Sequence, residues 1–178
     1  MGSRFGTDGI RGLVGTDVTV ELALALGPDQ KIYVLNGNGT KLPGGISPDS
    51  PYRNYAEDML RFSDNEAFES EGSKPPACYV LRTGPDGKEW ELWAGGMRNA
   101  YDFDFNENGE LFTFDSDMEW DWGTPWYRAT RITHLVSGGE SGWRDGMRMW
   151  ADEYTDSVPP VVSIGIGSPT GVKFGTKS

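Results

Sequence analysis

The stretch that decides the fold runs from Gly95 to Arg144: GGMRNAYDFDFNENGELFTFDSDMEWDWGTPWYRATRITHLVSGGESGWR. Between residues 101 and 106 aromatic and polar residues alternate, which is the period of a strand with one buried face. Asn108 and Gly109 follow, and both tolerate the positive φ of a tight hairpin turn. We therefore predict a hairpin whose return strand covers residues 111–114.

Acidic residues and tryptophans interleave directly after this hairpin. The carboxylates supply hard oxygen atoms at close spacing, which suits calcium, although they do not follow the EF-hand pattern. A solvated acidic loop held in place by packed tryptophans explains the same residues equally well. We expect a long loop here and a further strand over residues 131–136. The acidic positions are Asp115, Asp117, Glu119 and Asp121.

The rest of the chain also favours short strands over helices. The 178 residues include 25 glycines and 11 prolines, a composition typical of many turns. Thr19 could cap a short helix over residues 20–26, but the apolar run Leu22–Leu26 is too short for periodicity to distinguish that helix from a strand. Outside the Gly95–Arg144 stretch we expect strands over residues 31–35, 78–82, 88–94, 161–166 and 172–174.

Charge and residue counts exclude several classes of function. The chain has 16 Lys and Arg against 27 Asp and Glu, a net charge of −11, which argues against nucleic acid or an anionic membrane surface as partner. A single cysteine, Cys78, excludes an intrachain disulfide, and a single histidine, His134, excludes a multi-histidine metal site. We find neither a stretch apolar enough to span a membrane nor a signal peptide.

Several separate motifs, in the right order, resemble one known family, the quinoprotein glucose and sorbosone dehydrogenases, and within it the membrane-bound dehydrogenase branch. The similarity extends over about five-sixths of the chain, although the family proline after the Arg-Asn pair is Ala100 here. The resemblance implies an all-β fold: a partial β-propeller of about two to three blades of a six-bladed type, with long loops. The matching segments are Gly27–Asp58, Gly96–Asn99, Asn108-Gly109, Asp115–Asp121, Gly139–Trp143 and Gly167–Gly175.

The resemblance implies a cofactor site at Arg98 and Asn99. In the glucose dehydrogenases of this family, the arginine of this pair binds pyrroloquinoline quinone (PQQ), a planar tricarboxylate. A guanidinium group suits that ligand because it is permanently charged, pairs with carboxylates and stacks on flat rings. On the residues alone, the alternative is that Arg98 pairs with a loop carboxylate while Asn99 satisfies backbone groups at a strand entry.

The family also binds calcium next to this cofactor. Asp115, Asp117 and Glu119 are the candidate metal ligands, because they supply hard oxygens at close spacing at about the place where the family holds its calcium. The family holds its calcium partly through the backbone carbonyls of a Gly-Pro pair, and the aligned residues here are Asp117 and Met118. This departure alters the geometry that the resemblance implies.

The family's catalytic base has no counterpart in the chain. The resembled enzymes carry a histidine just before the strand that leads into Gly27-Pro28-Asp29, and residues 19–26 contain none. We therefore expect a fragment of a PQQ-dependent sugar or alcohol dehydrogenase-like propeller that is catalytically incomplete. The alternative is a non-catalytic propeller-type module that binds a carbohydrate or a protein.

Residues 1–27 resemble a different protein, the start of phosphoglucosamine mutase. Phe5 to Gly12 read FGTDGIRG, as that family does before an amphipathic helix. The later motifs of the mutase have no counterpart, so we do not expect its activity. We divide the chain into an N-terminal segment over 1–27, fused or artefactual, and a partial propeller domain over 28–178.

A propeller that is not closed exposes strand edges and apolar blade faces. We therefore expect self-association through those open edges. Members of the resembled family are usually exported, but the N-terminus has no recognisable export signal, so the sequence does not predict a location.

Overall fold

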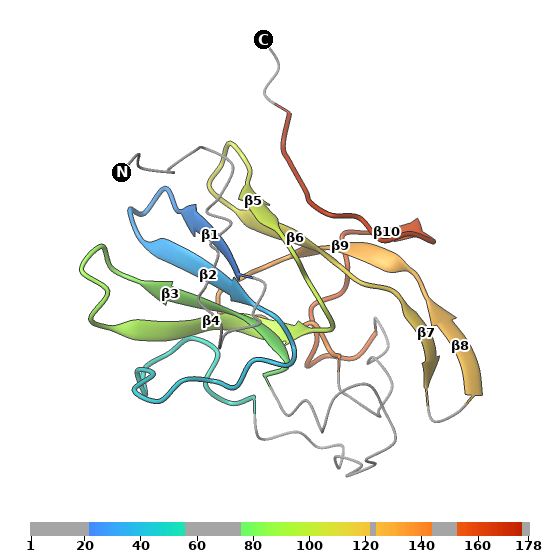
Figure 1. Cartoon of the computed structure of the whole chain (residues 1–178), viewed down its shortest axis with the longest axis horizontal. Helices are drawn as coiled ribbons and strands as arrows, with labels where there is room; N and C mark the ends of the chain where they lie inside the picture. The colour runs from blue at the N-terminus through green and yellow to red at the C-terminus, as the bar shows by residue number, and fades with distance from the viewer. Residues whose placement is uncertain (1–21, 56–75, 122–123, 144–152, 176–178) are drawn as a thin grey trace, which may run out of the picture.

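The computed structural model describes residues 22–55, 76–121, 124–143 and 153–175, and all regular structure within these ranges is β (Figure 1). In this part of the chain no helix is long and apolar enough to cross a membrane. The strands are β1 (Leu22–Leu26), β2 (Ile32–Asn36), β3 (Cys78–Thr83), β4 (Trp90–Met97), β5 (Phe103–Phe105), β6 (Leu111–Asp115), β7 (Met118–Asp121), β8 (Thr124–Arg128), β9 (Thr130–His134) and β10 (Val162–Gly165).

Two four-stranded antiparallel sheets follow each other along the chain. The first has the order β1-β2-β3-β4, a simple meander. The second is built from β5, β6, β9 and β10 in that spatial order, so it is also a meander once the β7–β8 ribbon is set aside. The first strands of the two sheets, β1 and β5, contact each other. Successive four-stranded meanders with adjacent first strands are the arrangement of neighbouring propeller blades.

The two sheets share one hydrophobic core. Its buried members come from β2, β3 and β4 on one side and from β5 and β6 on the other. The alternation of side chains along a strand explains this, since every second residue of each strand faces the other sheet. The core consists of Tyr33, Leu35, Cys78, Val80, Ala94, Met97, Ala100, Phe103, Leu111 and Leu135.

A loop covers the outer edge of the first sheet. Ile46 forms a bridge with Trp90, and the amide of Tyr52 donates to the backbone oxygen of Leu92. Ser50 accepts a hydrogen bond from the Leu92 amide through its hydroxyl oxygen, 3.0 Å away. These contacts satisfy backbone groups of β4 that would otherwise be open to another strand.

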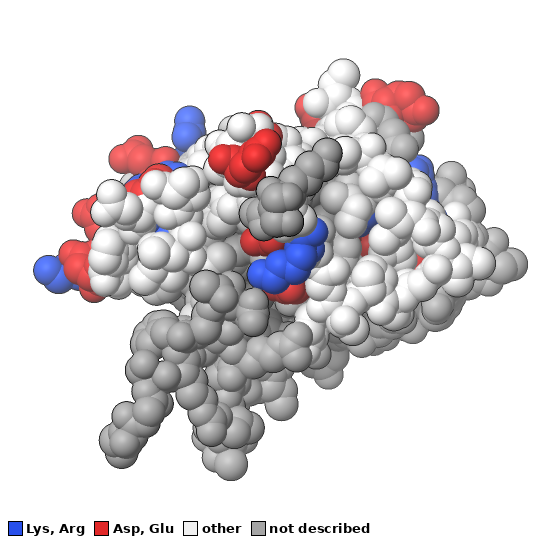
Figure 2. Space-filling view, turned by 90° about the horizontal axis from the view of Figure 1, so that it is seen from above, with Lys and Arg blue, Asp and Glu red and all other residues white. Residues whose placement is uncertain are grey.

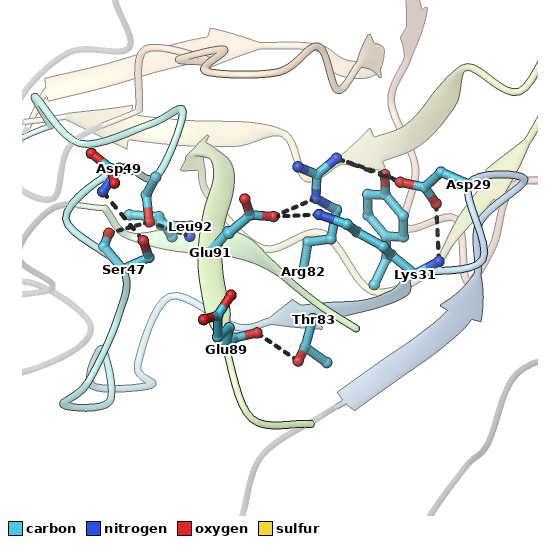
Figure 3. Close-up of polar contacts among 11 residues, drawn as sticks. Asp29, Lys31, Ser47, Asp49, Arg82, Thr83, Glu89, Glu91 and Leu92 are labelled. Atoms are coloured by element: carbon cyan, nitrogen blue, oxygen red, sulfur yellow. Dashed lines mark hydrogen bonds and ion pairs between the residues drawn. The ribbon is translucent and has the colours of Figure 1, made fainter. Parts of the chain in front are cut away.

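A row of charged side chains crosses the first sheet (Figure 3). Glu91 on β4 accepts from Arg82 on β3 at 2.8 Å and from Lys31 before β2 at 3.1 Å. Arg82 also lies 3.5 Å from Asp29, and its guanidinium group is 4.0 Å from the ring centre of Trp93. The row therefore links β3 and β4 to the turn that leads into β2.

Several predictions from the sequence are confirmed and others are wrong. The all-β fold is confirmed, and of the two readings of residues 19–26, the structure shows a strand over 22–26, inside the segment assigned to the N-terminal part. The expected strand over 172–174 is not formed. Instead, the Phe174 amide donates a hydrogen bond to the Asp104 carboxylate. The expected long loop after residue 115 contains the β7–β8 ribbon, which projects from the sheets in Figure 1.

Candidate functional site

Three connections meet at one end of the two sheets. β2 and β4 end there because alternate strands of a meander run in the same direction, and β6 of the second sheet ends beside them. The side-chain oxygen of Asn99, after β4, lies 3.9 Å from where a Cβ on Gly37 would stand. The Ser116 hydroxyl, after β6, donates to the backbone oxygen of Asn99 at 2.9 Å. Segments far apart in sequence therefore form one surface around the Arg98-Asn99 pair.

Asp115 holds the Arg98-Asn99 segment in place. Its Oδ1 accepts hydrogen bonds from the backbone amides of Arg98 at 2.9 Å, Asn99 at 3.0 Å and Ser116 at 3.0 Å. A carboxylate that accepts several amide hydrogens fixes the backbone more firmly than a neutral acceptor would. Asp115 is completely buried, so these bonds form away from water.

The charge of Asp115 is balanced by Arg131 on β9. Nη2 of Arg131 lies 3.1 Å from Oδ2 of Asp115, and the exposed fractions of the two side chains are 5% and 0%. The same nitrogen donates to the backbone oxygen of Ser141 at 2.8 Å. A buried ion pair of this kind must be complete, because either partner alone would be an uncompensated buried charge.

Arg98 lies at the surface end of this network. Its Nη1 donates to the backbone oxygen of Asp117 at 2.6 Å and is 4.0 Å from the Asp117 carboxylate. This contact agrees with the alternative interpretation of Arg98, pairing with the acidic segment. Its side chain is 18% exposed, so part of it reaches the surface. The amide side chain of Asn99 is exposed beside it.

The two glycine motifs of the sequence lie against each other behind the Arg98-Asn99 pair. Gly95 and Glu140 form a parallel bridge, and the Trp143 amide donates to the oxygen of Gly96 at 2.8 Å. Glu140 is buried and accepts hydrogen bonds from the Tyr52 hydroxyl and from the amide of Gly142. A Cβ on Gly96 would lie inside the space that the Glu140 carboxylate occupies. Only glycine therefore fits at position 96.

Of the three predicted metal ligands, the structure describes the side chains of Asp115 and Asp117. Both oxygens of Asp115 are used by protein donors, so this residue has a structural role. Asp117 lies beside Arg98, and the side chain of Glu119 lies outside the described part of the structure. Among the described residues no three His, Cys, Asp or Glu side chains gather as a metal site. Calcium binding by Asp115, Asp117 and Glu119 remains a prediction.

His134 and Cys78 lie apart from the surface of this site. The His134 ring stacks on Phe112 with ring centres 4.5 Å apart. Phe112 precedes Asp115 by three residues on β6, which places the histidine about 10 Å along the strand from the site. Burial, with a smaller effect of Asp115, raises the pKa of the Cys78 thiol, so it is no thiolate nucleophile.

The structural comparison gives the class of protein to which this arrangement is similar. No family model and no curated protein matches the chain. One similar solved structure is the PQQ-bound form of aldose sugar dehydrogenase from Streptomyces coelicolor, with a TM-score of 0.51 and 18% sequence identity. The match covers 84% of this chain and 37% of the dehydrogenase chain. It therefore shows that the chain has the fold of part of such a propeller-type dehydrogenase.

Proposed function

We propose that this chain forms part of the quinone-binding face of a PQQ-dependent sugar or alcohol dehydrogenase-like propeller. The observation that carries the proposal is the Arg98-Asn99 pair, presented where three connections meet and fixed by the buried Asp115. The structural similarity to a PQQ-bound dehydrogenase supports it at the level of the fold.

The residues present fit one edge of the quinone. Arg98 supplies a guanidinium group on a partly exposed side chain, and Asn99, an exposed residue, supplies an amide with both a donor and an acceptor. Because Arg131 neutralises Asp115, that carboxylate adds little repulsion against an anionic ligand. Asp117 does face Arg98, so a bound carboxylate would compete with it unless a cation were bound alongside.

The contribution of this chain would be binding and orientation. PQQ, when bound, supplies the electron-accepting chemistry of an alcohol oxidation. Arg98 would hold a carboxylate of the quinone, and Asn99 would hydrogen-bond next to it. Asp115 would keep both residues aligned through their amides, so that little ordering is needed on binding.

Calorimetric titration with PQQ, with and without calcium, tests this proposal. We expect saturable binding that weakens at least about tenfold in Arg98→Ala, equivalent to about 1.4 kcal/mol. Lys88→Ala is the matched control, because Lys88 is a highly exposed cation in a turn of the first sheet and should not affect the affinity. Equal affinities for the two variants, or no binding by the folded protein, would refute the proposal.

Catalysis by this chain alone is not part of the proposal, since the family histidine is absent from residues 19–26. The binding-module alternative gains no support from the described tryptophans. Trp90, Trp93 and Trp143 each pack with a different core cluster, so their rings have a structural role. A carbohydrate platform on the other tryptophans remains a prediction.

A further inference from the structure

Exposed apolar side chains gather at β10. Four of the seven large apolar residues that are exposed in the described structure lie between residues 161 and 166, and Ile166 is 89% exposed. A fifth, Tyr127, joins them through a 2.9 Å hydrogen bond from its hydroxyl to the oxygen of Gly165. An apolar group of this kind on a protein surface indicates an interaction site. The four residues are Val161, Val162, Ile164 and Ile166.

β10 is also an edge strand with an open side. It is the last strand in the order of the second sheet and pairs only with β9 among the described strands. The corresponding edge of the first sheet, at β4, is covered by the loop over 46–52. No such cover is present over the outer side of β10 in the residues that the structure describes. Such an edge can pair with another extended strand.

The charge distribution favours a second copy of this chain as the partner. The chain carries a net charge of −11, yet no charged residue occurs from Ser157 to Val172. Pairing of this segment with its own copy would therefore bring none of its own residues into like-charge contact, whereas a strongly basic partner would find no acidic group in the segment to pair with. Figure 2 shows that charged side chains leave broad areas of the surface free.

We propose that two copies of the chain associate by antiparallel pairing of β10 with β10. A strand that pairs with its own copy forms a self-complementary interface around a two-fold axis, so one patch serves both partners. The residues around Ser163 would lie near the axis, and Val162 and Ile164 would pack against their counterparts. Pairing would bury the exposed apolar side chains and satisfy the open backbone groups together.

Sedimentation velocity over a range of protein concentrations tests this assignment. We expect a reversible dimer, and we expect Ile164→Lys to raise its dissociation constant at least about tenfold. A lysine on an edge strand opposes pairing by charge and by solvation. Leu26→Lys is the control, because Leu26 is equally apolar and 70% exposed but lies on β1, and it should leave the dimer intact.

Cysteine cross-linking gives a second readout that does not depend on weakening the dimer. Ser163→Cys should form a disulfide-linked dimer under mild oxidation, and Leu26→Cys should not; Cys78 does not interfere because it is fully buried. A protein that is monomeric at every concentration would overturn the proposal. So would a dimer that is unaffected by Ile164→Lys, or one cross-linked equally well through Leu26→Cys, since its interface would lie elsewhere.

Discussion

Asp115 determines the stability of the candidate site at the residue scale. Its replacement by alanine would remove the acceptor of three backbone amides and leave Arg131 as a buried, unpaired cation. We expect Asp115→Ala to lower the free energy of unfolding by about 3–5 kcal/mol, measured by urea denaturation. Glu107→Ala, at an exposed carboxylate, should change it by no more than about 0.5 kcal/mol. Similar losses in the two variants would contradict the role assigned to Asp115.

Gly96 is a second position with a strict requirement. Its φ of +76° disfavours any side chain, and a Cβ would collide with the Glu140 carboxylate. We therefore expect Gly96→Ala to destabilise the protein by at least about 2 kcal/mol. Gly39→Ala is the matched comparison, because nothing lies within 4 Å of its Cβ position. Thermal unfolding should show a clear fall in Tm for the first variant alone; an unchanged Tm for Gly96→Ala would show that the packing against Glu140 is wrong.

The sequence could identify Arg98 and Asn99 but not the residues that hold them. The resemblance contains the Arg-Asn pair as a local motif, so it was found directly. Arg131 is 33 residues further along and carries no motif, and only the pairing of β6 with β9 brings it to Asp115. The acidic spacing makes Asp115 a candidate metal ligand, but it shows only the type of side chain and not the backbone amides that donate to it.

At the scale of elements, the charged row across β2, β3 and β4 links stability to pH. Burial by itself would raise the pKa of the Glu91 carboxyl, but hydrogen bonds from Arg82 and Lys31 outweigh it and lower that pKa. A lowered pKa in the folded state means that the unfolded state binds more protons in acid. The stabilisation is therefore present above the ordinary pKa of glutamate and is lost as the pH falls through the lowered value.

Urea denaturation of the unchanged protein and of Glu91→Gln, between neutral pH and about pH 3, tests this link. We expect Glu91→Gln to be the less stable of the two at neutral pH, by up to about 1 kcal/mol because the pair is partly exposed. The difference should shrink as the solution becomes acidic. A difference that stays constant with pH would show that the ion pairs contribute nothing.

Local sequence signals predicted most of the elements. The hairpin between β5 and β6 forms as expected, with Gly109 at a φ of +80°. Asn108 does not share this positive φ, and the turn closes through a hydrogen bond from the Asn106 amide to the Glu110 oxygen, so it is longer than a two-residue turn. The β7–β8 ribbon was missed although Met118, Trp120 and Trp122 alternate with Asp117, Glu119 and Asp121, because the dense negative charge of this stretch suggested a loop. Residues 172–174 show the opposite error, because a strand was expected there and none forms. Phe174 instead donates its amide to Asp104 and packs its ring against Phe112.

At the scale of the whole molecule, the shared core makes the two sheets interdependent. Met97 and Leu111 belong to different sheets and lie in the same buried cluster. We expect the described sheets to unfold in a single cooperative transition, with equal calorimetric and van't Hoff enthalpies. Two separate transitions in differential scanning calorimetry would mean that each sheet is stable alone.

The fold class was accessible from sequence, whereas the arrangement of the site was not. Turn residues, alternation and the resemblance together gave an all-β partial propeller, and the structure shows two adjacent four-stranded meanders. The meeting of residues 37, 99 and 116 depends on how the meanders pack, which no local pattern encodes. The stack of Phe112 and His134 lies toward the opposite end of β6 and β9. The pairing of these strands therefore keeps the single histidine of the sequence away from the candidate site.

Amide hydrogen exchange with and without PQQ tests the central claim most directly. If the quinone binds where the three connections meet, slower exchange should appear over residues 96–101 and 115–117 and should be absent from the distant turn over 84–88. The same protection should be lost in Arg98→Ala. Protection confined to other segments, or none at saturating quinone, would contradict the assignment of this surface as a quinone site.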